Sequence, residues 1–159
     1  MHWFLIQASI LLVILAFSTF VTWYEGSALL DNPWEWEYST LFSQMLSGEV
    51  RSDEHISQLD YFVYAAKFHP VFPTVMVISS IYLILLIGYR LLKDYSKWLM
   101  LYLASCGCAL LTISFFLMNA ATRGGEILTI TFMGSGLLVL CFALLMYFTR
   151  FHKIRLGNR

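Results

Sequence analysis

The sequence predicts an all-α membrane protein with four transmembrane helices, and three observations support this fold class. Four apolar runs without Asp, Glu, Lys or Arg occupy most of the 159 residues. Each has roughly 18 to 22 residues, which at about 1.5 Å of rise per residue matches a hydrocarbon core about 30 Å thick. Only 13% of the residues are charged, whereas about a quarter of a soluble domain is charged. Most of the basic residues, finally, cluster at two places along the chain.

The spans are expected at residues 3–24, 71–89, 98–118 and 127–148. The first could be mistaken for a secretory signal, but nothing basic precedes its apolar core and no clear cleavage site follows, so we expect it to stay attached. Pro70 and Pro73 bracket the entry to the second, because the residue before a proline is driven away from helical geometry. Residues 68–73 should therefore form a structured hinge. The spans and their connections make one membrane domain, residues 1–159.

The third and fourth spans carry small residues of the kind that let transmembrane helices approach closely. The small faces consist of Ala104, Cys108 and Thr112 in the third span and of Thr131 and Ser135, beside two glycines, in the fourth. We expect the two helices to pack there, with Ser114 satisfied by a hydrogen bond between helices. The three cysteines lie within these spans and should behave as small apolar residues.

Orientation is predicted from Lys and Arg, which favour cytoplasmic loops. Seven of the ten lie in the 90–97 turn and the 150–159 tail. They are Arg90, Lys93, Lys97, Arg150, Lys153, Arg155 and Arg159. The 25–70 segment between the first two spans instead carries eight acids against Arg51 and Lys67. We therefore expect both termini in the cytoplasm and the 25–70 segment on the extracytoplasmic face.

The 25–70 segment is too long for a plain turn and should be partly helical. Asn32 can cap a helix with Pro33 at its first position, and Gly48 supplies its end. Ser52 can cap a second helix, whose apolar face should lie on the membrane or on the helix bundle. The residues of that face are Ile56, Leu59, Phe62, Val63 and Ala66.

Aromatic residues gather at the expected span borders, as in the belts that Trp and Tyr form at membrane interfaces. For Trp34 and Trp36 two interpretations are open. Both indoles can sit at headgroup depth with Glu35 pointing to water, or they can anchor a partner protein, because Trp is prominent in interface hot spots. The candidate partner-binding residues are Trp34, Trp36, Tyr38 and Phe62.

The acids and histidines of the 25–70 segment raise the question of a chemical site. No metal site is predicted, because His55 and His69 lie fourteen residues apart, unlike the close ligand spacing of metal motifs. Most of the acids should simply be solvated, and we predict no catalytic residue and no cofactor. Four polar groups could serve a small ligand at the membrane boundary, namely Glu25, Glu35, Asp60 and His69.

One family resemblance is carried by short motifs in the first half of the chain. They are Trp23-Tyr24-Glu25-Gly26-Ser27, Asp31-Asn32-Pro33-Trp34-Glu35-Trp36 with Tyr38-Ser39, Asp60 to Lys67, and Phe72-Pro73. The chain resembles a family of small, uncharacterised Bacillus membrane proteins over the first span, the 25–70 segment and the start of the second span. The resemblance implies a Gram-positive cell membrane and brings no activity or catalytic residue with it.

Two functional hypotheses follow from these features. The leading one is a non-enzymatic accessory protein of the cell membrane that presents its acidic, Trp-rich segment to a membrane partner or to a second copy of itself. The alternative is an enzyme or binder of a lipid-like or quinone-like molecule at the outer interface, which would need a pocket beneath the polar candidates. The expected surroundings are the lipid bilayer, and a nucleic-acid partner is not predicted.

Overall fold

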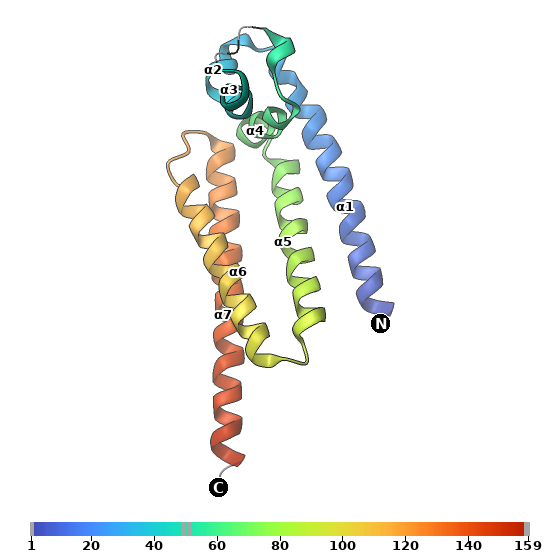
Figure 1. Ribbon diagram of the computed structural model, residues 1–159, viewed down its shortest axis with the longest axis vertical. Coiled ribbons are helices and arrows are strands. Elements are labelled where there is room, and N and C mark those ends of the chain that lie inside the picture. The colour runs from blue at the N-terminus through green and yellow to red at the C-terminus, as the bar shows by residue number, and fades with distance from the viewer. Residues whose placement is uncertain (1, 49, 51, 158–159) are drawn as a thin grey trace.

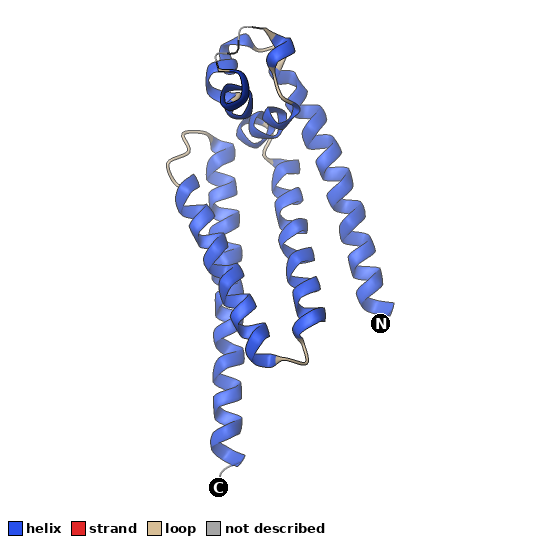
Figure 2. Ribbon diagram, in the orientation of Figure 1, coloured by secondary structure: helices blue, strands red, loops and turns tan. Residues whose placement is uncertain are grey.

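Every regular element in the described part of the chain is a helix (Figure 2). The computed structural model describes residues 2–48, 50 and 52–157, without the side chains of Ser47 and of 150–157. Four helices are long and apolar enough to cross a membrane, which confirms the four predicted runs as helices. They are α1 (His2–Gly26), α5 (Val71–Leu92), α6 (Ser96–Leu117) and α7 (Arg123–Gly157). The predicted charges of Glu49, Arg51, Arg150, Lys153, Arg155 and Arg159 lie outside the described side chains.

The long helices form two antiparallel pairs, α1 with α5 and α6 with α7 (Figure 1). Far fewer contacts join α5 to α6 and α7 than join the members of each pair. Both ends of the chain lie at the same end of the molecule, and the 25–70 segment covers the other end (Figure 1). We call the end with the α5–α6 connection the turn end and the opposite end the capped end.

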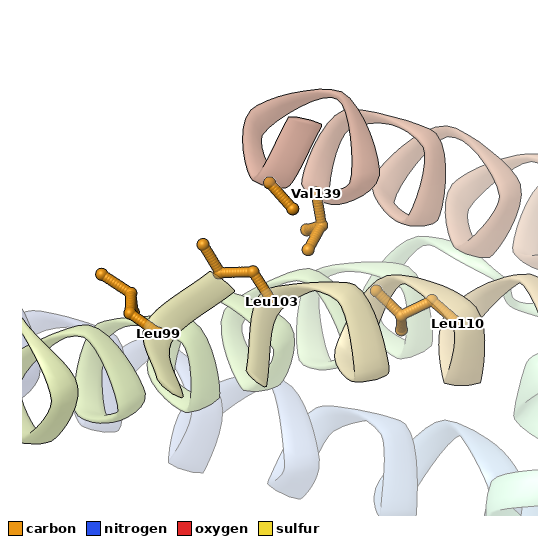
Figure 3. Close-up of a cluster of buried hydrophobic side chains, with 5 residues drawn as sticks. Leu99, Leu103, Leu110 and Val139 are labelled. Atoms are coloured by element: carbon orange, nitrogen blue, oxygen red, sulfur yellow. The ribbon is translucent and has the colours of Figure 1, made fainter. Parts of the chain in front are cut away.

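The α6–α7 pair holds the larger apolar core. Its buried side chains are Leu99, Leu103, Leu110, Val139 and Ala143, four of which Figure 3 labels. The backbones of the two helices come close where Gly107 meets Gly136, because a Cβ on either glycine would lie 3.2 Å from the other's carbonyl oxygen. Leucine packing and these glycines therefore set the contact.

The prediction of a close α6–α7 pair is confirmed, but the face predicted for the third span is wrong. Cys108 and Thr112 are exposed, because the buried stripe of α6 runs through its leucines and Gly107 instead. The expected hydrogen bond between helices is present, since the Ser114 hydroxyl donates to the Thr129 carbonyl at 3.0 Å. Polar groups thus support the packing near the capped end.

Six short elements follow α1 in the 25–70 segment. They are η1 (Ser27–Leu29), η2 (Pro33–Glu35), α2 (Trp36–Ser39), α3 (Leu41–Ser47), η3 (Asp53–His55) and α4 (Gln58–Phe68). The predicted hinge at residues 68–73 is confirmed only in part, because α4 ends at Phe68 but α5 already begins at Val71, so that Pro73 lies within a helix. Gly48 ends α3 as predicted, with a φ of 78° that a residue with a side chain rarely adopts.

Two predicted helix boundaries in this segment are wrong. The helix expected from Pro33 to Gly48 is broken at Thr40, whose φ of −106° and ψ of 49° are not helical. The second helix begins at Gln58, and its cap is Ser57, whose hydroxyl oxygen accepts from the Leu59 amide. Ser52 precedes only the η3 turn. The break at Thr40 and the start of α4 at Gln58 let the chain fold back on itself over one end of the bundle.

Helix α4 joins the two helix pairs through backbone contacts at two glycines. A Cβ on Gly26 of α1 would lie 2.0 Å from the Tyr61 carbonyl oxygen, and one on Gly124 of α7 would lie 2.0 Å from that of Ala66. Only a residue without a side chain allows backbones this close. The α4 helix therefore lies against both pairs at the capped end.

The buried face of α4 differs from the predicted one. Its buried residues are Asp60, Tyr61, Tyr64 and Ala65. Leu59 is 53% exposed, and Phe62, Val63 and Ala66 are half-buried. Ile56, expected on the same helical face, is buried but precedes the helix. Apolar periodicity failed here because Tyr rings bury well and because Asp60 finds hydrogen-bond partners inside the fold.

Candidate functional site

Asp60, a candidate ligand-binding acid, is fully buried and bonded within the protein. Its side chain is 0% exposed. The carboxylate accepts the backbone amides of Phe42 at 2.8 Å and Ser43 at 2.9 Å, and it also accepts the Ser43 hydroxyl. These amides belong to the first turn of α3, where backbone N–H groups lack helical partners and favour a negative charge. Asp60 therefore caps α3 from a different helix, and its oxygens are already engaged by α3.

Trp34 and Trp36 occupy different environments. The Trp36 indole N–H donates to the Leu29 carbonyl at 2.9 Å, and its ring packs against the buried cluster of Leu29, Ile56, Tyr61 and Tyr64. Trp34 is 87% exposed. Both interpretations treated the two indoles alike, whereas in the structure the Trp36 ring helps to hold the segment together and the Trp34 ring faces outward.

Glu35 belongs to a polar chain that also contains Ser39 and Lys67. The Ser39 hydroxyl donates to the Glu35 carboxylate at 2.9 Å and accepts from the Lys67 ammonium at 3.0 Å. Lys67 also donates to the Tyr38 carbonyl, near the end of α2 where carbonyls lack helical partners. Glu35 is half-buried, so it does not simply point to water as one interpretation expected.

This chain of contacts has opposing effects on the ionisation of Lys67. Burial lowers the pKa of Lys67 below its ordinary value of 10.5, and the nearby Glu35 carboxylate partly opposes that shift. A lysine bonded in this way links α4 to α2. Lys67 therefore helps to hold the folded 25–70 segment together.

The four polar candidates for a small ligand do not converge. Asp60 and His69 are at opposite ends of α4, about 13 Å apart along the axis at about 1.5 Å per residue. Asp60 bonds α3 while Glu35 bonds Ser39. Glu25 has one buried carboxylate oxygen that finds no hydrogen-bond partner among the described residues. A shared site of all four residues is therefore not formed in this structure.

An apolar surface on α3 was not singled out from the sequence. Leu41, Phe42, Met45 and Leu46 occupy one side of the helix and are all exposed, with Met45 at 82%. Trp34 and Tyr38 are exposed on the elements just before it. The spacing of the four α3 residues could have indicated this surface. The sequence analysis instead placed them in a longer helix that was expected to continue through Thr40. We call these six residues the α3 surface.

Phe62, the remaining candidate for partner binding, lines a groove between α1 and α4. The groove measures about 480 Å³. Its lining residues are Ala16, Thr19, Phe20, Trp23, Gln58, Leu59 and Phe62. Glu25 lies on the opposite side of α1 from this lining, since it follows Ala16 by nine residues, or two and a half helical turns. The groove is therefore apolar apart from Gln58 and Thr19.

Comparison with known proteins found a matching family and one similar protein. A family model described as a domain of unknown function (DUF4306) matches residues 5–92. The chain belongs to this family. It is also similar to the uncharacterized protein YjdJ of Bacillus subtilis (strain 168), with 37% identity over 81 residues that cover 50% of this chain and 74% of YjdJ. No solved structure matches the chain.

The family match coincides with one part of the fold. Residues 5–92 include nearly all of α1, the whole 25–70 segment and α5. The α6–α7 pair lies outside the match, although Gly124 of α7 contacts α4 closely. The contacts of Asp60, Trp36 and Lys67 described above thus all lie within the part of the chain that the family model matches.

Proposed function

We propose that this protein is a non-enzymatic accessory protein of the cell membrane whose α3 surface binds a partner membrane protein. Both termini are cytoplasmic in this proposal, and the 25–70 segment is extracytoplasmic. The distribution of Lys and Arg supports the orientation, because Arg90, Lys93 and Lys97 all lie at the turn end.

The observation that carries the proposal is the exposed α3 surface. Large apolar side chains grouped on an otherwise polar, acidic segment are unfavourable in water and typical of interaction sites. The surface belongs to a well-organised segment, because Asp60 holds one end of α3 and the Trp36 ring anchors the preceding turn. A partner would therefore meet a preformed surface, which lowers the entropy lost on binding.

Site-specific photo-crosslinking tests the proposal in living cells. A photo-reactive amino acid at position 45 should crosslink one defined membrane protein, and the same amino acid at position 59 should not. Leu59 is a matched control because it is also exposed and apolar but lies on α4. Crosslinks to lipid alone at position 45 would contradict the proposal and would instead indicate that α3 lies on the bilayer surface.

A substitution series then tests the energetics of the same surface. Trp34→Ala should weaken recovery of the crosslinked partner by at least about tenfold, as expected for an interface anchor. Trp36→Phe keeps the internal ring but removes its hydrogen bond, so it should leave recovery nearly unchanged. An unaltered partner yield with Trp34→Ala would count against this residue as an anchor.

A second candidate function, binding of a lipid-like or quinone-like molecule, is favoured by the α1–α4 groove. Aromatic rings of Phe20, Trp23 and Phe62 line it, as in many sites for apolar ligands. Phe62→Ala should then reduce quenching of Trp fluorescence by a short-chain quinone in detergent. Equal quenching of the parent chain and the Phe62→Ala variant would argue against this candidate.

A further inference from the structure

A second apolar groove lies near the turn end, between α5 and the α6–α7 pair. It measures about 350 Å³. Six of its lining residues are Tyr82, Leu85, Leu86 and Tyr89 from α5, Leu103 from α6 and Phe142 from α7. Leu103 and Val139, which also lines the groove, belong to the α6–α7 core shown in Figure 3. The groove is therefore an apolar gap beside a tightly packed pair of helices.

Specific contacts hold this gap at a defined width. The Tyr102 hydroxyl donates to the Ile84 carbonyl at 2.8 Å, which bonds α6 to α5. The Tyr102 ring also lies so close to Gly88 that a Cβ there would be 2.1 Å from a ring carbon. Only a glycine lets the ring reach this position. Because the two helices are joined at this point, α5 is held beside α6 next to the groove.

The charge at the end of the groove indicates which kind of ligand it binds. The groove residues on α5 recur at positions 82, 85, 86 and 89, and Lys93 lies one helical turn further on the same face. Lys93 is exposed, and so are Asp94 and Lys97 in the adjoining turn, whereas Arg90 lines a separate groove against α1. Two cations against one carboxylate leave this end of the groove positive. An acyl chain matches the apolar lining of the groove, and a negatively charged phosphate matches the Lys93 ammonium.

We propose that this groove binds one acyl chain of an anionic phospholipid, with the lipid phosphate beside Lys93. The proposal rests on membrane insertion of the four helices, as in the proposed function. At hydrocarbon depth an apolar groove is filled by acyl chains rather than by water. Each basic residue near the headgroup contributes about 1 kcal/mol to the attraction of anionic lipid, or about fivefold in affinity. The bound lipid would fill the gap between the two helix pairs.

Native mass spectrometry of the full-length chain tests this assignment. Carbonate extraction of the membranes first establishes insertion, so that failed insertion and failed lipid binding are distinguished. The purified chain is then offered equimolar phosphatidylglycerol and phosphatidylcholine with identical acyl chains. It should retain one phosphatidylglycerol at least about fivefold better than phosphatidylcholine. Equal retention of the two lipids, or a second copy of the chain in place of lipid, would overturn the proposal.

Two variants separate the headgroup contact from the groove. Lys93→Gln should reduce the preference for phosphatidylglycerol by about fivefold, whereas Arg123→Gln, a cation at the capped end, should leave it unchanged. Leu86→Trp fills the groove and should abolish retention of both lipids, whereas Leu101→Trp on an exposed face of α6 should not. Circular dichroism confirms that each variant is folded. Full lipid retention by folded Leu86→Trp would show that the lipid binds elsewhere.

Discussion

Replacement of Asp60 should release α3 while leaving the long helices in place. Asp60→Ala removes the acceptor of two backbone amides and one hydroxyl in a site that is closed to water. A hydrogen bond to a charged group contributes about 1.5 to 3 kcal/mol, and loss of a helix cap costs about 0.5 to 2 kcal/mol. Because such contributions are not additive, we expect a local destabilisation of about 3 kcal/mol.

Residue-resolved hydrogen exchange in detergent micelles measures this loss directly. A local change of about 3 kcal/mol corresponds to amide exchange about two orders of magnitude faster at Phe42 and Ser43. Asp60→Asn keeps the shape and one acceptor oxygen, so it should give a smaller increase, about tenfold. Asp53→Ala is the matched control, because Asp53 is exposed and, among the described residues, accepts the neighbouring Glu54 amide at 3.0 Å.

Two results would refute the capping role. Unchanged exchange at Phe42 and Ser43 in folded Asp60→Ala would show that the carboxylate does not stabilise α3. Equal acceleration throughout α1 and α5 would show that the substitution unfolds the protein globally. The expected pattern is confined to α3 and the adjoining turns, because the Asp60 carboxylate bonds the first turn of α3 and its own helix stays packed on α1 and α7.

Three further predictions concern the contacts that close the 25–70 segment. The lowered pKa of Lys67 should make the free energy of unfolding rise with pH between that pKa and 10.5, because the unfolded chain binds more protons in this range. Glu35→Gln removes the carboxylate that opposes the shift, so it should lower the Lys67 pKa further, which NMR of dimethylated lysine would measure. Gly26→Ala should lower the free energy of unfolding by about 1 to 3 kcal/mol in denaturant titrations, because the new Cβ would lie 2.0 Å from an α4 carbonyl oxygen. Gly134→Ala is the control and should leave stability unchanged, because its Cβ would point into open space. Trp36→Phe should cost about 1 kcal/mol in the same assay, and an unchanged midpoint would show that the indole hydrogen bond does not stabilise the segment.

The features of the long helices could be predicted because they depend on local composition. An apolar run of about 20 residues can satisfy its backbone only as a helix in lipid, whatever surrounds it. Pro70 and Gly48 likewise act through their own backbone geometry, so the break at residues 69–70 fell within the predicted hinge and the end of α3 was predicted at the correct position. Boundaries that depend on distant contacts, such as the break at Thr40 and the cap at Ser57, were not predicted.

The candidate site shows the same division. The motifs around Trp34 and Asp60 were recognised as the distinctive part of the chain, and that part falls within the family match. Their roles were not predicted, because Asp60 bonds amides 17 and 18 residues away and Trp36 bonds a carbonyl 7 residues away. Periodicity could not show that an acid would be buried, since its burial depends on donors that α3 brings to it.

The sequence by itself determined four apolar helices, the placement of the acidic and basic clusters along the chain, and membership in a family of small, uncharacterised Bacillus-type proteins. These follow from composition and short motifs, which can be read without knowing the contacts between residues in the fold. Only the tertiary structure decided which tryptophan is exposed, which acid is structural and where grooves lie. Those properties arise when α4 crosses the ends of two helix pairs, since burial and hydrogen bonding are set by neighbours far away in the sequence.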